Sequence, residues 1–196
     1  MTQRTILLIR HGESTFNAAA AGGLTRDPLL FDAPLTARGR DQASAAAATM
    51  RERPVDVVVV SPLTRALQTA QAIFGDHPSR PTLSVEVGHR ERLESSCDKG
   101  RSPGELALAF PSLSFGHLPD TWWHDAGEPN DAGIRVEPLD VMLARLKDFA
   151  TALAARPERH IVVVGHATFF HHLTGRWLSN CEILPWDGEV SGVETA

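Results

Sequence analysis

The residues whose types and spacing predict chemistry in this chain begin with Arg10, His11 and Gly12. Arginine offers a fork of hydrogen-bond donors, and histidine offers a nucleophilic ring nitrogen. Glycine lets the backbone turn sharply and lets a ligand come close. A guanidinium group next to an imidazole on a glycine turn therefore favours the binding of a phosphate group.

Two further polar residues occupy equivalent places along the chain. His166 follows the apolar run at residues 161–164, and Arg65 lies in the first turn of a helix that we expect to begin at residues 61–62. A cation in that position opposes the helix dipole, which indicates a functional reason for it. A bound anion could share the helix N-terminus with Arg65.

Short apolar runs predict the strands that must position these residues. We expect buried strands at residues 6–9, 56–60 and 161–164. Two further strands are expected towards the sheet edges, at 82–87 and at 181–187, and Pro185 interrupts the second of these. In open α/β sheets, ligands bind at the carboxyl ends of the strands. The strands therefore predict that Arg10, His11, Arg65 and His166 gather in one pocket.

Helical spacing and capping residues predict the helices between these strands. Thr36 is a good N-cap for a helix over the alanine-rich residues 37–50, and Ser61 is a good N-cap for the next helix. Ser102 and Glu105 form a capping box for a short helix that follows them. We expect a long helix near 136–157 with Leu139, Met142, Leu143, Leu146, Phe149 and Leu153 buried, and a last helix near 168–178. Residues 22–34 and 88–101 have the composition of loops.

The composition limits the class of protein. A chain of 196 residues with 42% apolar residues fits a single domain over residues 1–196, with a lid-like excursion around 88–133. Nineteen basic and 24 acidic residues, a formal charge of −5, argue against nucleic-acid binding. Two distant cysteines, no membrane-spanning stretch and no secretion signal indicate a cytoplasmic protein.

Four motifs in order then carry a resemblance over nearly the whole chain. They are RHGES with Asn17 downstream, LTARGRDQA, SPLTRALQTA and VVVGH. In their order and spacing the chain resembles the histidine phosphatase superfamily, which has the phosphoglycerate-mutase-like fold. The resemblance implies a three-layer α/β/α sandwich with a mostly parallel central sheet.

The same resemblance implies a role for each residue of the pocket. His11 is expected to take a phosphoryl group on its ring nitrogen, while Arg10, Arg65 and His166 bind the phosphate oxygens. With these groups in place, we expect neither a metal ion nor a cofactor. His171 and His172 diverge as helix neighbours and do not complete a zinc site.

An acid must also protonate the leaving group, and the resemblance favours Glu91 in the segment HRERLE. Glu86 and Glu94 are the alternatives. Asn17 and Ser61 are expected to be supporting phosphate contacts. We assign Cys97 to a structural loop, and Trp122 with Trp123 to packing in the excursion.

The expected activity is hydrolysis of a small phosphorylated metabolite, with inorganic phosphate as product. A mutase that moves the phosphoryl group within its substrate is the first alternative, but the chain is short and has an alanine-glycine stretch where glycolytic mutases carry a tryptophan. A non-catalytic module that binds a phosphorylated ligand or a protein is the second. Either a monomer or a homodimer fits the sequence, and the substrate itself stays open.

Overall fold

A central five-stranded sheet organises the protein, whose computed structural model describes residues 4–192. The strand order is β3-β2-β4-β1-β5, and neighbouring strands are parallel except for β5, which runs antiparallel to β1. The strands are β1 (Thr5–Arg10), β2 (Val57–Val60), β3 (Thr82–Val85), β4 (His160–Gly165) and β5 (Ile183–Trp186). The mostly parallel sheet and both edge strands are confirmed. Pro185 does not interrupt the last strand, because β5 runs through it and pairs it with Leu7.

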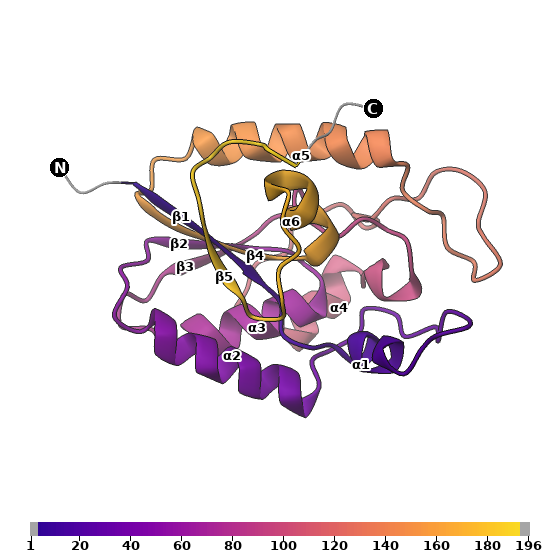
Figure 1. Ribbon diagram of the computed structural model, residues 1–196, viewed down its shortest axis with the longest axis horizontal. Helices are drawn as coiled ribbons and strands as arrows, with labels where there is room; N and C mark the ends of the chain where they lie inside the picture. The colour runs from indigo at the N-terminus through magenta and orange to yellow at the C-terminus, as the bar shows by residue number, and fades with distance from the viewer. Residues whose placement is uncertain (1–3, 193–196) are drawn as a thin grey trace.

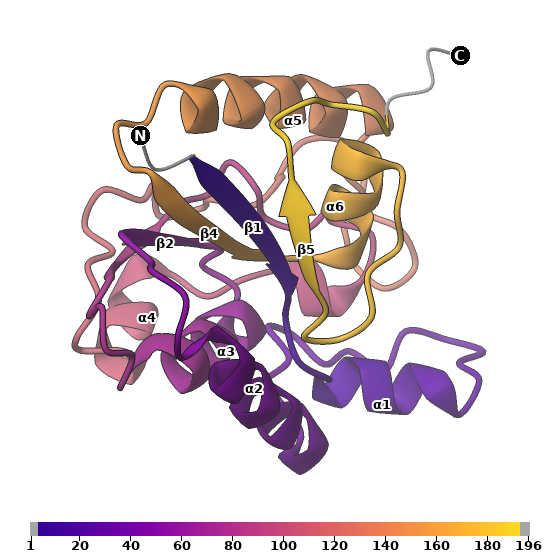
Figure 2. The ribbon, with the colours of Figure 1, turned by 60° about the vertical axis from the view of Figure 1, so that its left-hand side comes forward.

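Helices cover both faces of this sheet, as Figures 1 and 2 show. The helices are α1 (Thr15–Ala21), α2 (Ala37–Met50), α3 (Thr64–Phe74), α4 (Pro103–Ala109), α5 (Leu139–Ala154) and α6 (Ala167–Thr174), with the short 3-10 helix η1 (Ser96–Asp98). Helices α2 and α3 lie on one face, and α5 and α6 lie on the other. The expected three-layer α/β/α sandwich is confirmed.

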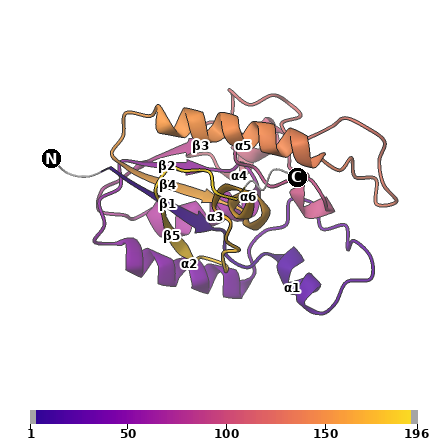
Figure 3. The same ribbon diagram turned by 45° about the horizontal axis from the view of Figure 1, so that its top comes forward.

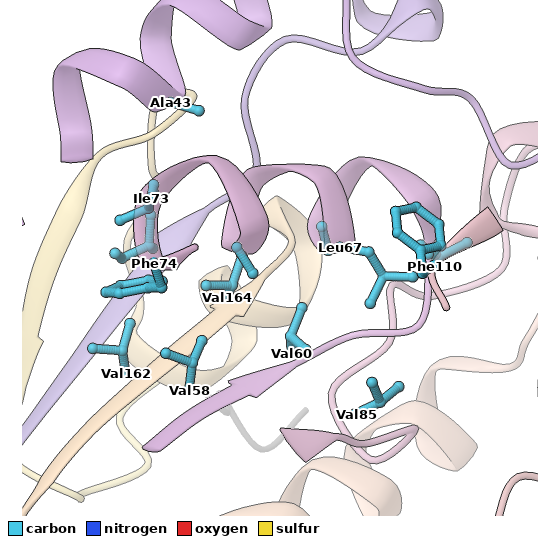
Figure 4. Packing of buried hydrophobic residues seen from close by; sticks show 14 of the residues in the cluster. Ala43, Val58, Val60, Leu67, Ile73, Phe74, Val85, Phe110, Val162 and Val164 are labelled. Carbon is cyan, nitrogen blue, oxygen red and sulfur yellow. The ribbon is translucent and has the colours of Figure 1, made fainter. Parts of the chain in front are cut away.

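The alternation of side chains along each strand builds two cores. Val58 and Val60 of β2 pack with α2 and α3, whereas Val57 and Val59 pack with α5 and α6. Figure 4 shows α3 over the first of these layers, with Leu67 above the β2 valines. Because both faces of the central strands are covered, β2 is apolar at every position, and β1 and β4 are apolar between their end residues.

Helix ends agree with the capping pattern at two of the predicted sites. The Thr36 side chain accepts a hydrogen bond from the backbone of Gly39 at the start of α2. Ser102 and Glu105 form the predicted capping box of α4. Ser61 is not a cap, because α3 begins three residues later with Leu63 at its N-cap position.

Other helix ends also differ from expectation. The long helix expected near 136–157 is α5, which begins at Leu139 and ends at Ala154. Helix α6 ends at Thr174 because Gly175 adopts the left-handed conformation that terminates helices. Leu139, predicted to be buried, is 41% exposed because it is the first residue of α5. None of the described helices has the length and apolar character needed to cross a membrane.

The strand register places the carboxyl ends of three strands side by side. Arg10 pairs with Gly165 across β1 and β4, and Val60 pairs with Val164 across β2 and β4. The loop that follows α1 and the long segment between α4 and α5 lie at this same end of the molecule, as Figures 1 and 3 show. Residues 10–12, 61–65 and 165–166 therefore share one edge of the sheet.

The excursion at residues 88–133 has regular structure only in η1 and α4. Its Trp122 is 3% exposed, its indole nitrogen donates to the carbonyl of Arg101 at 2.8 Å, and its ring packs against Trp123 at 5.4 Å between centroids. A side chain at Gly100 would overlap the Trp122 ring. Packing of the two tryptophans is confirmed, whereas the function of the excursion as a lid stays a prediction.

Candidate active site

His11 lies directly after β1 and is 3% exposed. Its Nδ1 atom lies 2.7 Å from the carbonyl oxygen of Gly12, and a carbonyl only accepts hydrogen bonds, so Nδ1 carries the proton. The other ring nitrogen, Nε2, accepts a hydrogen bond of 3.2 Å from Nε of Arg65. The lone pair of His11 is therefore on Nε2 and is directed towards a guanidinium group.

Burial and two cations keep this imidazole neutral. Desolvation, and then the charges of Arg65 and Arg10, lower the pKa of His11 well below its usual 6.5. A neutral imidazole is the form that can act as a nucleophile.

Arg65 connects His11 to the loop that contains η1. Its side chain is 3% exposed, and its Nη1 donates to the carbonyl of Cys97 at 2.6 Å. Its Nη2 forms an ion pair of 2.9 Å with Asp98, and the charge of this carboxylate helps to raise the pKa of Arg65. The buried guanidinium is therefore compensated on one side and directed at His11 on the other.

Cys97 is buried in the loop for which the sequence predicts a structural role. Its side chain is buried, and this burial, together with the charge of Asp98, raises the pKa of the thiol. A thiol of that kind is not reactive. Its carbonyl group, rather than its sulfur, serves the site by accepting from Arg65.

Arg10 lies at the end of β1, next to His11 in the chain. Its Nη1 donates to the carbonyl of Leu178 at 2.7 Å. Its Nε is buried and has no hydrogen-bond partner among the described residues. Burial lowers the pKa of Arg10, while the charge of Glu91 opposes that effect. Buried donors without partners are rare, so this one is available to an anionic ligand.

His166 comes from the end of β4 and is completely buried. Its ring centroid lies 5.2 Å from that of His11, and its Nε2 lies 2.7 Å from the Ser61 hydroxyl. Its Nδ1 is buried without a partner among the described residues. Burial, followed by the charge of Arg65, lowers the pKa of His166 well below 6.5.

Ser61 thus lies next to the site, where its hydroxyl contacts His166. Whether it also contacts a phosphate stays a prediction. Asn17 lies at the third position of α1, where its Oδ1 accepts from the backbone of Ser14 at 3.2 Å in a capping box. Asn180 donates to the carbonyl of His11 at 2.9 Å and lies 3.5 Å from that same Oδ1.

The Glu91 side chain contacts the N-terminus of α6, the helix that begins directly after His166. Its carboxylate accepts hydrogen bonds of 3.0 Å from the backbone N–H groups of Thr168 and Phe169. It therefore caps α6 from a different loop, because His166, the N-cap residue, makes no side-chain cap. Burial and the nearby charge of Asp98 raise the pKa of Glu91.

The two alternative carboxylates point elsewhere. The Glu86 carboxylate is 42% exposed, accepts from the Ser84 hydroxyl and lies 3.8 Å from Arg156. Glu94 is 46% exposed and pairs with Arg92 at 2.6 Å. Glu91 is the one of the three whose charge acts on both Arg10 and Arg65. The geometry therefore favours Glu91 over both alternatives.

Sequence reasoning missed Asp98 and Thr69. Asp98 follows Cys97 in a polar loop, and no local pattern indicates its contact with Arg65. The Thr69 hydroxyl accepts from the backbone N–H of Gly12 at 3.0 Å and donates to the carbonyl of Arg65 at 2.7 Å. Thr69 lies one helical turn after Arg65, and this spacing was the available signal for it.

The arrangement is suited to a tetrahedral oxyanion. The His11 ring lies 5.2 Å from the His166 ring between centroids, and its Nε2 lies 3.2 Å from Nε of Arg65. Nε of Arg10 and Nδ1 of His166 are buried without partners among the described residues, so both can contact a bound anion. Within residues 4–192, no three His, Cys, Asp or Glu side chains are grouped as metal ligands. His171 instead stacks on Trp177 at 4.1 Å between centroids.

Comparisons with known proteins agree with this chemistry. Residues 6–190 match the family model for the histidine phosphatase superfamily (branch 1). Glucosyl-3-phosphoglycerate phosphatase of Mycolicibacterium vanbaalenii is 29% identical over 204 residues, covering 100% of this chain and 85% of the relative. A phosphoglycerate mutase-like protein of Arabidopsis thaliana is 27% identical over 216 residues, which cover 91% of this chain and 76% of the relative.

A solved structure shares the fold. The mycobacterial glucosyl-3-phosphoglycerate phosphatase in complex with VO3 superimposes with a TM-score of 0.57 at 21% identity, covering 93% of this chain and 92% of that one. At this identity, the similarity establishes the fold and no more.

Proposed function

Because the chain belongs to the histidine phosphatase superfamily (branch 1), we propose that it hydrolyses phosphate monoesters of small metabolites through a phosphohistidine at His11. The observation that carries the proposal is the state of His11. Its Nδ1 proton is held by the Gly12 carbonyl, and its Nε2 lone pair faces Arg65 at 3.2 Å. A ring nitrogen that is neutral, oriented and next to a cation is prepared to attack phosphorus.

In the first step, His11 Nε2 attacks the phosphorus atom, and the bond between phosphorus and the leaving oxygen breaks. The leaving alkoxide takes a proton from the Glu91 carboxyl group. The raised pKa of Glu91 favours the protonated form that this step requires. The products are the free alcohol, the Glu91 carboxylate and a phosphoryl group on His11.

In the second step, water attacks the phosphorus atom and the P–N bond breaks. Glu91, now a carboxylate, accepts a proton from the attacking water. Inorganic phosphate leaves, and the lone pair returns to His11 Nε2. Each residue then has the protonation state with which the cycle began.

Charge on the transferred group is stabilised by cations and donors that are already in place. Arg65 and Arg10 supply guanidinium N–H groups, and the buried Nδ1 of His166 supplies a further donor when it carries the ring proton. In that tautomer, Nε2 of His166 accepts a hydrogen bond from the Ser61 hydroxyl. Preorganised groups of this kind usually make the largest contribution to such reactions. In this proposal Asn17 is a supporting contact to the phosphate, whereas Ser61 supports the site through His166, to which it donates its hydroxyl proton.

A panel of phosphorylated metabolites tests the proposal. Each is incubated with the protein in the presence of a strong chelator, and inorganic phosphate and isomerised substrate are measured in the same sample. We expect phosphate release that the chelator does not change. Isomerised product without phosphate would favour a mutase, and tight binding without either product would favour a binding module.

A further inference from the structure

A second cluster of charged side chains is buried next to the loop that carries Glu91. The Glu137 side chain is fully buried and pairs with Arg90 at 2.9 Å and with Arg145 at 2.7 Å. Arg145 adds a second hydrogen bond of 3.2 Å through Nε, so its contact with the carboxylate is bidentate. Both arginine side chains are only 12% exposed.

This cluster holds the backbone on both sides of Glu91. Arg145 Nη1 donates to the carbonyls of Gly88 at 3.0 Å and Arg90 at 2.9 Å. On the other side, the Glu137 backbone N–H donates to the carbonyl of Leu93 at 2.8 Å. The loop between these attachment points has no helix or strand of its own. Its shape therefore depends on these hydrogen bonds.

Arg145 also reaches the helix that receives the Glu91 carboxylate. Its guanidinium carbon lies 5.4 Å from the centroid of the Phe169 ring, and the backbone N–H of Phe169 donates to Glu91 at 3.0 Å. One side chain on α5 thus contacts both the loop that carries Glu91 and the helix that Glu91 caps. Glu91 is fixed relative to His166, which precedes α6.

Buried ion pairs are poor contributors to stability, because desolvation offsets most of their attraction. Leaving one member of such a pair buried and unpaired is costly, so the cluster favours the arrangement in which every member is paired. A proton donor gains from such a constraint, because a displacement of about 1 Å can cost roughly 100-fold in rate. From these contacts we infer that Glu137, Arg90 and Arg145 are positioning residues for Glu91, an inference that rests on the proposed function.

The test compares two substrates that differ in their need for a proton donor. An aryl phosphate such as 4-nitrophenyl phosphate leaves without much protonation, whereas glycerol phosphate requires it. We expect Arg145→Lys, which keeps the charge but loses the planar fork, to lower kcat for glycerol phosphate by about 10- to 100-fold with an unchanged KM. Turnover of 4-nitrophenyl phosphate should change by less than about 3-fold.

A double-mutant cycle separates positioning from general damage to the fold. If Arg145 acts through Glu91, Arg145→Lys should cause no further loss with glycerol phosphate when Glu91→Gln is already present. Arg156→Lys is the matched control, because Arg156 pairs with Glu158 at 2.9 Å outside the cluster and should leave both substrates unaffected. Arg90→Lys provides a second variant in case Arg145→Lys does not fold, as checked by thermal unfolding.

The outcomes distinguish the two proposals. Selective loss with glycerol phosphate that disappears in the Glu91→Gln background supports the inference. Equal losses with both substrates, or additive losses in the double variant, would overturn it while leaving the phosphatase proposal intact. A wild-type protein that turns over neither substrate would overturn the phosphatase proposal and the inference with it.

Discussion

Nε of Arg65 lies 3.2 Å from Nε2 of His11, and both side chains are 3% exposed. The two groups come from segments 54 residues apart, and they meet because β1 and β2 flank β4 with their carboxyl ends at one edge. The arginine donates to the nitrogen that is proposed to attack. In the proposed mechanism the phosphoryl group enters between these two atoms, and Arg65 donates to a phosphate oxygen instead.

We expect His11→Ala to abolish phosphate release, because no other group in the site replaces its Nε2. Loss of a nucleophile typically costs on the order of 10⁴-fold or more in kcat. The measurement is release of phosphate from 4-nitrophenyl phosphate, together with trapping of an acid-labile phosphoprotein in the wild type. His124→Ala, a change in the segment between α4 and α5, is the control and should keep full activity. Undiminished turnover by His11→Ala would end the assignment of the nucleophile.

Asp98→Asn should weaken the contact that orients the Arg65 guanidinium, while the side chain at position 98 keeps nearly the same shape. Asp98 is buried and holds Nη2 of Arg65 at 2.9 Å, so the neutral amide leaves this cation less well compensated. We expect kcat/KM to fall by about 10- to 100-fold, corresponding to the loss of one charge-assisted hydrogen bond.

The same variant should change the pH profile in a defined direction. The charge of Asp98 helps to raise the pKa of Glu91, so its removal lowers that pKa. Because Glu91 must be protonated in the first step, the alkaline limb of kcat/KM should move to lower pH. Glu94→Gln, which alters an exposed carboxylate, is the control. An alkaline limb that stays in place would contradict the link between Asp98 and Glu91.

Local patterns in the sequence predicted most of the elements around this site. The valine run of β2 and the apolar run of β4 predicted buried parallel strands, because both faces of those strands are covered. Thr36 and Ser102 predicted helix starts, because capping depends on residues a few positions apart. The position of the candidate site residues at the strand ends was predicted from the fold class, because ligands bind at the carboxyl ends of the strands in open α/β sheets.

Contacts between distant segments were outside the reach of such patterns. Ser61 precedes a proline and fits a helix cap locally, yet its hydroxyl contacts His166, 105 residues away. Glu137 meets Arg90 across 47 residues, and its burial could not be read from its place near the start of the expected long helix. Side chains of this kind act through tertiary geometry, so only the folded chain shows what they hold.

Gly12→Ala should disturb the turn that carries His11. A Cβ atom at Gly12 would lie 2.5 Å from the backbone carbonyl oxygen of Gly39, so one of the two segments must shift. We expect the free energy of unfolding to fall by about 1–3 kcal/mol, the usual cost of overpacking, and activity to fall with it.

The control for that change is Gly104→Ala, also a glycine within the described chain. Nothing lies within 4 Å of a Cβ at Gly104, which is inside α4, so alanine should preserve or raise stability by up to about 1 kcal/mol. Urea unfolding of both variants provides the measurement. Equal free energies of unfolding for the two variants would show that the close approach of Gly12 to Gly39 does not limit the stability of Gly12→Ala.

Stability should fall on acidification because of His89, which is fully buried against Phe149 and Phe169. Burial lowers the pKa of His89 from 6.5 to about 3. Below pH 6.5, His89 therefore binds a proton in the unfolded chain but not in the folded protein. The free energy of unfolding falls as the pH falls from 6.5 towards 3. For this one group the loss between pH 7 and pH 5 is about 2 kcal/mol.

His89→Phe isolates this effect, because it removes the titrating ring but keeps an aromatic group. The carbonyl of Val164, which accepts from His89 Nε2 at 3.1 Å, still accepts from the backbone N–H of Ser61. Whatever its stability at pH 7, the free energy of unfolding of the variant should fall by about 2 kcal/mol less than that of the wild type between pH 7 and pH 5, as measured by urea unfolding. Phe149→Leu disturbs the same cluster without removing a titratable group, so its loss should equal that of the wild type. A His89→Phe protein that loses as much stability as the wild type over this interval would show that His89 takes up its proton without unfolding.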